Sequence, residues 1–343
     1  MKIMVTGGAG YIGSTVSELL LQRGHSVVIV DNLCHSRRQS VPDRAEFVEC
    51  NIADRGRVES LFRYAMQEKA PFDGVIHFAA LIEAGESMQK PEIYFRNNTA
   101  STLALLEAML TCGLRRIVFS STAAVYGEPE AVPIPESASL RPTNAYGESK
   151  LMVEQMLGWF HRIHGLRSAA LRYFNVAGAA ETEQGILRGE EHEPESHLIP
   201  LILDVALGRR QSIKVFGSDY PTHDGTCVRD YVHVSDLAEA HLLALGALEK
   251  DRAAGQRLIY NLGNGSGFTV LEVIEAARRV TGHPIPVEMC PRRAGDPAVL
   301  VASSERAIAE LGWKPRYTQL DRIVKTAWTW HQTRHGVVAA SAT

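Results

Sequence analysis

The sequence contains neither a long apolar run nor a large excess of charge of one sign. No stretch approaches the roughly 18 consecutive apolar residues of a membrane-spanning helix, and the opening MKIMVTGG leads into a strand and a glycine turn rather than an apolar signal core. The formal net charge is only -3. Such a chain lacks the charge that would attract nucleic acid or an anionic membrane, so we expect neither partner and a cytoplasmic location.

Cysteine is scarce and scattered along the chain. The number is odd, and no Cys-x-x-Cys pair or Cys/His group has the spacing of a zinc site. We therefore predict reduced thiols and no metal site. The five residues are Cys34, Cys50, Cys112, Cys227 and Cys290.

What the chain does contain is an alternation of strand and helix patterns over its first half. An apolar content of 45% with 22% charged residues is typical of a globular protein. Strand-like and helical patterns that alternate in this way predict an α/β fold with a doubly wound parallel sheet. We expect strands at 2–6, 26–30, 46–49, 74–78, 116–120 and 167–173, and helices at 15–23, 58–68, 93–110 and 147–163.

The second half is less regular and predicts a smaller C-terminal α/β lobe. Turn-forming residues predict loops at 181–197 and 219–226, and helical patterns return at 198–207, 234–248 and 270–280. A strand pattern at 258–263 could rejoin the main sheet. We expect a Rossmann domain of 1–175 plus about 233–262, a substrate lobe of about 176–232 plus 263–335, and a flexible tail at 336–343.

The glycine-rich segment GGAGYIG predicts a dinucleotide site. Gly7, Gly10 and Gly13 lie between the first predicted strand and the first predicted helix. Glycines there permit a tight turn and let the backbone approach a pyrophosphate, which the helix N-terminus stabilises. Glycine triplets also occur in ordinary turns, but here strand, helix and a downstream acidic residue come together.

That acidic residue is Asp31, at the end of VVIVD, and it selects between cofactors. A carboxylate there can accept hydrogen bonds from both ribose hydroxyls and would repel a 2′-phosphate, so NAD is favoured over NADP. Arg37 and Arg38 follow soon after. We interpret them as a solvated surface pair.

The segment NAYGESK places Tyr146 four residues before Lys150 at the start of a predicted helix. This spacing puts both side chains on one helical face, although it also occurs in helices without any chemistry. For tyrosine to act as a base at neutral pH, its pKa of about 10 must fall by about 3 units, or roughly 4 kcal/mol. One ammonium about 6 Å away supplies on the order of 3 kcal/mol at an effective dielectric constant of about 20. The lysine alone therefore falls short.

Three ordered motifs resemble the extended short-chain dehydrogenase/reductase superfamily: the glycine triplet, the segment FSST that ends at Thr122, and the Tyr146-Lys150 pair. The segments FAALIEAGES, SSTAAVYGEP, AYGESKLMVEQ, LRYFNVAGA, YPTHDGTCVRDYVHVSDLA and RRAGDPA narrow the resemblance to the family of UDP-galactose 4-epimerases. It extends from Lys2 to about Trp313.

The resemblance implies a reaction and a role for each of three residues. Tyr146 would take the proton of the sugar 4-hydroxyl while the C4 hydride passes to NAD+. Lys150 would supply part of the lowering of the tyrosine pKa and would hold the nicotinamide ribose. The positive nicotinamide ring would supply the rest of that lowering. Thr122 would guide the proton, unless its hydroxyl only satisfies a backbone group. Rotation of the 4-keto sugar and hydride return to its opposite face would interconvert UDP-galactose and UDP-glucose with NAD tightly bound.

The resemblance also implies two sets of binding residues. Arg229 and Arg293 would hold the diphosphate, Asp296 the uridine ribose, Asn175 the phosphate side and Phe216 the uracil. The cofactor residues would be Gly7, Gly10, Tyr11, Ile12, Gly13, Asp31, Asn32, Asn51, Ile52, Phe78, Ala79, Ala80, Asn98, Tyr146, Lys150 and Tyr173. The substrate residues would be Thr122, Asn175, His197, Leu198, Phe216, Arg229, Arg293, Asp296 and Leu300.

Several positions depart from the family pattern. Ile82 replaces a lysine that often contacts the cofactor, and Asn51 replaces an aspartate that faces the adenine. His197 with Leu198 replaces an asparagine-leucine pair near the uracil. Leu300 lies near the position that limits room for an N-acetyl group, and its intermediate size favours non-acetylated sugars only weakly.

Three alternative functions are considered. One stays open, and particular residues argue against the other two. The substrate could be another UDP-sugar, such as an N-acetylhexosamine, a pentose or a uronate. A nucleotide-sugar 4,6-dehydratase would need an Asp-Glu pair where this chain has Ala123 and Ala124. A catalytically silent NAD-binding protein on the same fold would not need Thr122, Tyr146 and Lys150 together.

Two apolar helical stripes bear on assembly. Core packing explains such stripes by default, but the family pairs the corresponding helices, so the resemblance implies a homodimer. The stripes are Leu103, Leu106 and Leu110, and Met152, Met156, Trp159 and Ile163.

Overall fold

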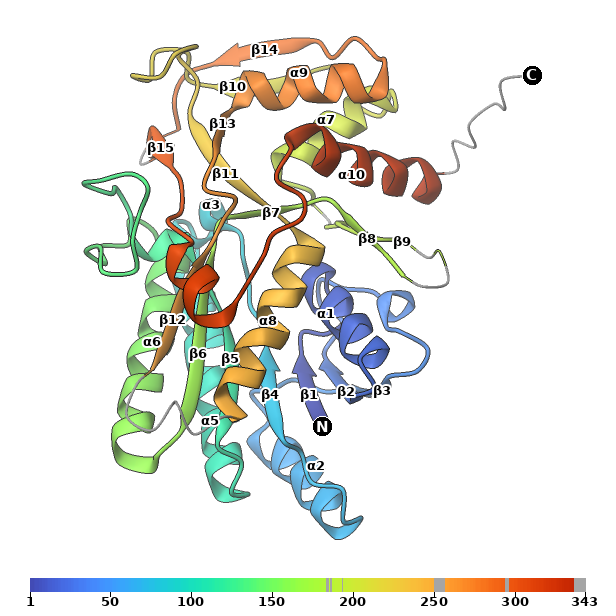
Figure 1. Ribbon diagram of the computed structural model, residues 1–343, viewed down its shortest axis with the longest axis vertical. Coiled ribbons are helices and arrows are strands. Elements are labelled where there is room, and N and C mark those ends of the chain that lie inside the picture. Colours follow the sequence, from blue (N-terminus) through green and yellow to red (C-terminus); the bar gives the residue numbers. More distant parts are fainter. Residues whose placement is uncertain (183–184, 186, 193, 250–256, 294–295, 336–343) are drawn as a thin grey trace.

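A seven-stranded parallel sheet forms the centre of the larger part of the molecule in the computed structural model (Figure 1). The structure describes residues 1–182, 185, 187–192, 194–249, 257–293 and 296–335, so the predicted tail at 336–343 lies outside it. Every neighbouring pair of strands is parallel, which confirms the predicted sheet. In spatial order the strands are β12 (Leu258–Leu262), β6 (Arg167–Tyr173), β5 (Arg116–Thr122), β4 (Gly74–His77), β1 (Lys2–Thr6), β2 (Ser26–Asp31) and β3 (Glu46–Glu49).

Helices cover both faces of this sheet, because alternate strand residues point to opposite sides. Ile3 and Val5 pack in one core cluster with helices α1 and α8, whereas Met4 packs in another with α2, α5 and α6. Figure 1 shows the two layers on either side of the sheet. Their bounds are α1 (Tyr11–Gln22), α2 (Arg55–Gln67), α5 (Ser101–Thr111), α6 (Ala145–His164) and α8 (Val234–Glu249).

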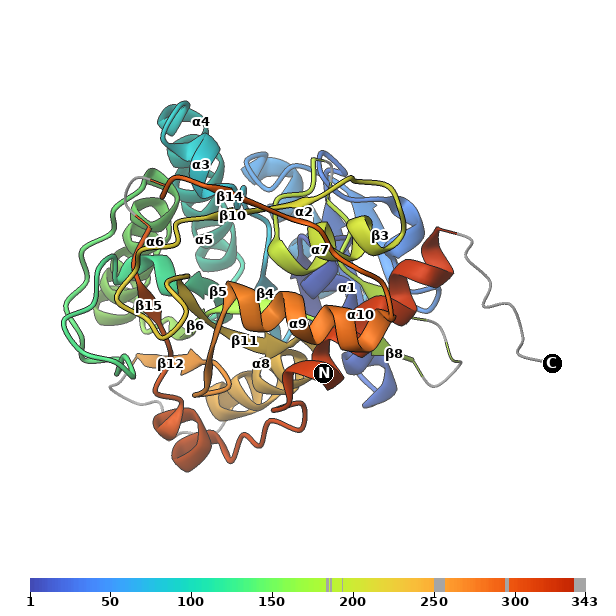
Figure 2. The same cartoon turned by 90° about the horizontal axis from the view of Figure 1, so that it is seen from above.

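The second part of the molecule is built around strand β11 (Val228–His233). It pairs antiparallel with β13 (Gly267–Thr269) and parallel with β15 (Val299–Leu300) and β7 (Asn175–Ala177). A separate parallel pair joins β10 (Ile213–Phe216) to β14 (Val287–Cys290), which run side by side in Figure 2. Helices α7 (Leu198–Ala206), α9 (Val270–Thr281) and α10 (Leu320–Arg334) share a third core cluster there.

Strand β12 returns to the seven-stranded sheet beside β6, as the pattern at 258–263 suggested. Because α8 covers that sheet as well, the chain crosses between the two parts more than once. The domain boundaries given above remain our proposal. Among the described residues, no helix has both the length and the apolar character needed to cross a membrane.

Some elements differ from the sequence expectation. The helix expected at 93–110 is divided into α4 (Pro91–Tyr94), a π-helical turn η2 (Phe95–Ala100) and α5. The segment at 181–197, expected to be a loop, contributes to a short antiparallel hairpin of β8 (Ala179–Glu181) and β9 (Leu187–Gly189). The remaining short elements are α3 (Ala84–Ser87), the 3₁₀ turns η1 (Arg38–Ser40) and η3 (Ala123–Val125), and the π-helical turn η5 (Ala307–Leu311).

Candidate active site

The glycine turn between β1 and α1 is closely packed and requires its glycines. Gly7 has a φ of +69°, and a Cβ there would lie 2.5 Å from the backbone nitrogen of Ala79. A Cβ on Gly13 would lie 2.3 Å from the carbonyl oxygen of Gly7. Gly10 begins α1 without a side-chain cap, and the first turn carries no acidic residue. The helix N-terminus therefore offers its positive end to an anion.

Asp31 is held against this turn from the end of β2. One carboxylate oxygen accepts a hydrogen bond of 3.0 Å from Ala9 N, and the other accepts bonds from Leu33 N and the Ser36 hydroxyl at 2.9 and 2.8 Å. These bonds fix the orientation of a carboxylate that is only 7% exposed.

The two arginines that follow Asp31 are engaged elsewhere. An Arg37 nitrogen lies 3.0 Å from a Glu191 oxygen, and the Arg38 guanidinium lies 4.5 Å from the centre of the Phe47 ring. These contacts agree with the interpretation of both arginines as surface residues rather than as a clamp for a 2′-phosphate.

The other predicted cofactor residues gather at the carboxyl ends of the parallel strands, where ligands of such sheets bind. The Tyr11 hydroxyl donates to Gly178 O at 2.6 Å, and the side-chain oxygens of Asn32 and Asn51 accept from Cys34 N and Ala53 N. Ile82, at the family lysine position, is 37% exposed. Ile12 lies in α1, Asn32 follows β2, Asn51 and Ile52 follow β3, Phe78, Ala79 and Ala80 follow β4, and Tyr173 ends β6.

Asn98 lies in the π-helical turn and is fully engaged with the protein. Its side-chain oxygen accepts from Leu81 N at 2.8 Å, and its amide donates to Leu81 O and to the Ser149 hydroxyl, both at 3.0 Å. The side chain therefore fastens the segment after β4 to helix α6. Asn98 thus lies in a π-helical turn, at a position where the sequence predicts a regular α-helix.

Helix α6 places Tyr146 beside Thr122 through its N-terminal packing. The Asn144 side chain caps the helix by accepting from Gly147 N at 2.8 Å. A Cβ on Gly147 would lie 2.7 Å from Ala124 O, so glycine lets the helix start approach the turn after β5. Lys150, one turn further along, donates to Ser120 O at 2.8 Å. Thr122, Tyr146 and Lys150 thus converge at the end of one strand.

Burial dominates the electrostatics of this group. It raises the pKa of Tyr146 to about 12, although a hydrogen bond with Thr122 acts in the opposite direction, and the charge of Glu83 adds to the rise. Burial also lowers the pKa of Lys150 to about 7. Base catalysis by Tyr146 requires a lower pKa than the value of about 12. The groups of the chain therefore do not supply the required lowering by themselves.

A buried ion pair beneath these residues was not predicted from the sequence. Glu154, in α6, accepts hydrogen bonds of 2.9 and 2.6 Å from Arg172 in β6 and one of 2.5 Å from the Ser121 hydroxyl. Arg172 also donates to the Tyr126 hydroxyl at 2.9 Å. The sequence contains one signal of this ion pair. Glu154 lies four residues after Lys150 on the same helical face, and a charge that is buried there requires a partner.

Four of the nine predicted substrate residues lie on or beside β11. Arg229 lies opposite Leu300 in the parallel pairing and forms an ion pair with Asp296. Asn175 lies opposite Tyr231 in the pairing with β7. The Arg293 guanidinium lies 3.9 Å from the centre of the ring of Phe216, which is the last residue of β10.

His197 is oriented differently from the other predicted substrate residues. His197 occupies the N-cap position of α7, immediately before Leu198, but its side chain makes no capping hydrogen bond. Its Nδ1 lies 2.7 Å from a Glu190 oxygen instead. The imidazole therefore belongs to a group of acidic and histidine side chains in the loop before α7.

Comparison with known proteins identifies relatives over nearly the whole chain. The NAD dependent epimerase/dehydratase family matches residues 3–263. The UDP-glucose 4-epimerase of Streptomyces lividans is 54% identical over 97% of this chain and 96% of its own. A crystal structure of a UDP-glucose 4-epimerase has a TM-score of 0.91 at 47% identity, covering 98% of both chains. That of the Stenotrophomonas maltophila enzyme with bound NAD and formylated UDP-arabinopyranose has a TM-score of 0.90 at 43% identity, covering 98% of this chain and all of that one.

Proposed function

Because the chain belongs to the NAD dependent epimerase/dehydratase family, we propose that it interconverts UDP-galactose and UDP-glucose by inverting C4 of the sugar. The observation that carries this proposal is the convergence of Thr122, Tyr146 and Lys150 at the end of β5, two strands away from β1 and its glycine turn. Full-length similarity to UDP-glucose 4-epimerases supports the same reaction.

The site fits NAD by its own geometry. The turn that contains Gly7 and Gly13 has no room for side chains, the start of α1 lacks a side-chain cap, and Asp31 is fixed beside both. When bound, NAD supplies the oxidant that accepts the C4 hydride and returns it. No net oxidation occurs, so the cofactor stays with the protein through each cycle.

The chain's own residues move the proton in this proposal. Tyr146 takes the proton of the sugar 4-hydroxyl and later returns it, and Thr122 orients the phenol through their shared hydrogen bond. Because burial raises the pKa of the phenol to about 12, Tyr146 requires positive charge nearby to act as a base. Lys150, whose Nζ lies 6.0 Å from the centre of the tyrosine ring, supplies part of that charge when its amine is protonated, a state that burial disfavours by lowering its pKa to about 7.

The second part of the molecule would bind the UDP group. Arg229 and Arg293 are the cations proposed for the diphosphate, which guanidinium groups bind well. Arg229 pairs with Asp296, and the Arg293 guanidinium covers the Phe216 ring, so both cations are already oriented by neighbouring side chains. Asn175 and Leu198 complete the proposed contacts, and Leu300, opposite Arg229, would limit the size of the sugar substituent.

We also propose a homodimer and a cytoplasmic location. Trp159 and Ile163 on α6 are 58% and 67% exposed, and Leu103 on α5 is 38% exposed, which leaves apolar surface for a second copy. Light scattering that gives only the monomer mass of 37.7 kDa would contradict the dimer. All five cysteines are free, as expected in a reducing compartment.

Proton NMR of the purified protein with UDP-galactose, without added NAD, tests the reaction. UDP-glucose should appear, and Tyr146→Phe should slow its formation by about 10²–10⁴-fold, the usual contribution of a general acid-base. Tyr64→Phe, at a residue that is 60% exposed on α2, is the matched control and should keep the parent rate.

A parallel reaction with UDP-N-acetylgalactosamine tests the sugar preference. Conversion of this sugar would mean that Leu300 leaves room for the acetyl group. If neither sugar changes even after NAD is supplied, the proposed reaction is wrong for these substrates. Pentose or uronate derivatives, or a silent NAD-binding role, would then be the remaining alternatives.

A further inference from the structure

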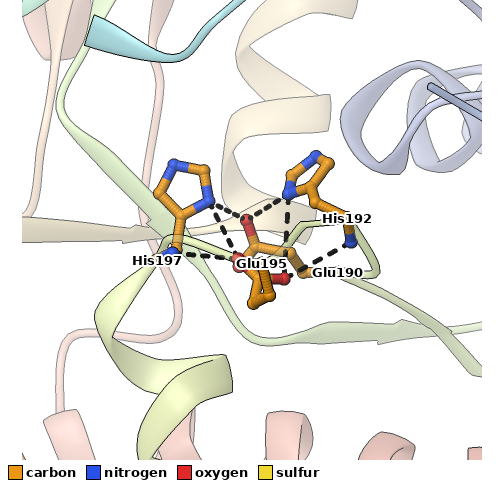
Figure 3. Close-up of side chains that lie close together, drawn as sticks. All are labelled: Glu190, His192, Glu195 and His197. Carbon is orange, nitrogen blue, oxygen red and sulfur yellow. Dashed lines mark hydrogen bonds and ion pairs between the residues drawn. The ribbon is translucent and has the colours of Figure 1, made fainter. Parts of the chain in front are cut away.

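Four potential metal ligands converge in the loop between β9 and α7. Figure 3 shows the carboxylates of Glu190 and Glu195 between the imidazole rings of His192 and His197. One ligand atom from each residue lies within 4.8 Å of all the others. None of the four has a role in the proton transfer proposed above.

The nitrogen–oxygen separations in this group range from 2.7 to 3.9 Å, around the value expected for a tetrahedral site. His192 Nδ1 lies 3.4 Å from a Glu190 oxygen and 3.9 Å from a Glu195 oxygen. His197 Nδ1 lies 2.7 Å from the same Glu190 oxygen and 3.5 Å from the other oxygen of Glu195. Zinc bonds to nitrogen and oxygen are about 2.0–2.2 Å long, so tetrahedral ligands are separated by about 3.4 Å. Small side-chain movements would therefore complete the coordination sphere.

An ion-pair network explains part of this arrangement but leaves one atom without a hydrogen bond. His192 Nδ1 is buried, and none of the residues that the structure describes gives it a hydrogen bond of acceptable geometry. A nitrogen held 3.4 Å from its nearest carboxylate oxygen is placed better for a shared cation than for direct pairing.

The surroundings support and orient the ligands. Glu195 accepts hydrogen bonds of 2.8 and 2.9 Å from Ser196 N and His197 N, which fixes its carboxylate. The Glu190 side chain is only 8% exposed, whereas that of His197 is 45% exposed and leaves a path for entry. Such outer-shell hydrogen bonds are a usual part of metal sites.

We propose that Glu190, His192, Glu195 and His197 form a structural site for a divalent transition-metal ion of the Zn²⁺ class. Two imidazoles and two carboxylates suit such an ion, and four protein ligands close the tetrahedral sphere, as in structural rather than catalytic zinc sites. The ion would fasten the loop that leads into α7, where Leu198 is a proposed substrate residue. The spacing of the cysteines in the sequence gave no indication of this site, because none of its four ligands is a cysteine.

A second group, Asp204, His331 and His335, provides the internal control. There an Arg209 nitrogen lies 2.7 Å from Nδ1 of His335. A cation already occupies the space that an ion would need, so we expect no tight metal site in this group.

The experiment uses tag-free, chelator-treated holoenzyme in a buffer that does not bind metal. Calorimetric titration with Zn²⁺ should give one tight site per chain, and Co²⁺ should give the intense visible absorption of tetrahedral coordination. His192→Ala and the isosteric Glu195→Gln should each weaken Zn²⁺ binding by more than about 100-fold, because even the loss of an outer-shell partner costs up to about that factor. His335→Ala should bind Zn²⁺ as the parent does.

Circular dichroism and NAD content, measured without metal, check that each variant is folded. Zn²⁺ should raise the midpoint of thermal unfolding in the parent and in His335→Ala but not in the two ligand variants. Absence of stoichiometric binding in the parent would mean that the cluster is an ion-pair network only. Binding that persists in both ligand variants, or disappears in His335→Ala, would place the ion elsewhere and overturn the proposal. Because no sugar substrate is used, the result does not depend on the epimerase reaction.

Discussion

The ammonium of Lys150 donates a hydrogen bond of 2.8 Å to the carbonyl oxygen of Ser120, two residues before Thr122 on the same strand. Its Nζ also lies 6.0 Å from the centre of the Tyr146 ring. One side chain therefore joins α6 to β5 and places a charge beside the phenol. This arrangement makes the lysine a structural as well as an electrostatic component of the site.

Lys150→Met should reduce kcat by about 100-fold. A unit charge about 6 Å away at an effective dielectric constant of about 20 contributes on the order of 3 kcal/mol, or roughly two factors of ten. The rate is measured by NMR with saturating NAD, so that weaker cofactor binding is not mistaken for slower chemistry. Lys325→Met, on the exposed side of α10, should keep the parent rate. A fully active Lys150→Met would remove the lysine from the mechanism.

Gly13→Ala should reduce the amount of NAD that purifies with the protein. The new methyl group would lie 2.3 Å from Gly7 O and 2.8 Å from the Gly8 Cα, so the backbone of the turn must shift. Overpacking of this kind typically costs 1–3 kcal/mol, which corresponds to roughly 5- to 150-fold weaker binding if the strain acts on the cofactor site. NAD is measured by chromatography after denaturation.

Gly246→Ala is the control for that change. A Cβ at this position in α8 has no atom within 4 Å, and alanine favours a helix by up to about 1 kcal/mol over glycine. Its NAD content should equal that of the parent, and its stability should be equal or higher. Equal NAD loss in both alanine variants would show that the turn is not the cause.

Glu154→Gln should destabilise the protein by about 3–5 kcal/mol. The Arg172 and Glu154 side chains are only 2% and 3% exposed, so the variant leaves a buried guanidinium without its counter-charge. Urea unfolding at constant NAD concentration measures the loss. The double variant with Arg172→Met should lose less than the sum of the two single changes, because it no longer buries an unpaired charge. Strict additivity would mean that the pair is not coupled.

His241 should make the protein less stable in mild acid. Burial lowers its pKa to about 4, whereas an unfolded histidine has a pKa of about 6.5. Between these values the unfolded chain binds more protons than the folded one, so stability falls as the pH decreases. From pH 7 to pH 5 this residue alone should remove about 2 kcal/mol from the free energy of unfolding.

The variant His241→Phe tests that contribution. Whatever its stability at pH 7, its loss of stability between pH 7 and pH 5 should be smaller than that of the parent by about 2 kcal/mol. Urea titrations at both pH values measure the difference. An unchanged pH dependence would mean that folding does not lower the pKa of His241.

Local features made much of the fold predictable. Continuous apolar runs marked the buried parallel strands, and β12 was recognised although it joins the sheet far from its sequence neighbours. The short strands were harder, since β8 and β9 owe their pairing to each other rather than to any pattern within three residues. The π-helical turn at Phe95–Ala100 was missed because its surroundings, not its residue types, select it over a regular helix.

The sequence by itself determined the glycine turn, the acidic end of β2 and the Tyr146-Lys150 spacing, because each depends on a few neighbouring residues with strict steric or chemical requirements. Only the tertiary structure decided which distant groups meet. The pairing of Glu154 with Arg172, the bond from Lys150 to Ser120 and the orientation of His197 toward Glu190 all depend on how separate elements or a folded loop are packed. Buried charges need partners, but a sequence does not state which partner the packing brings within reach.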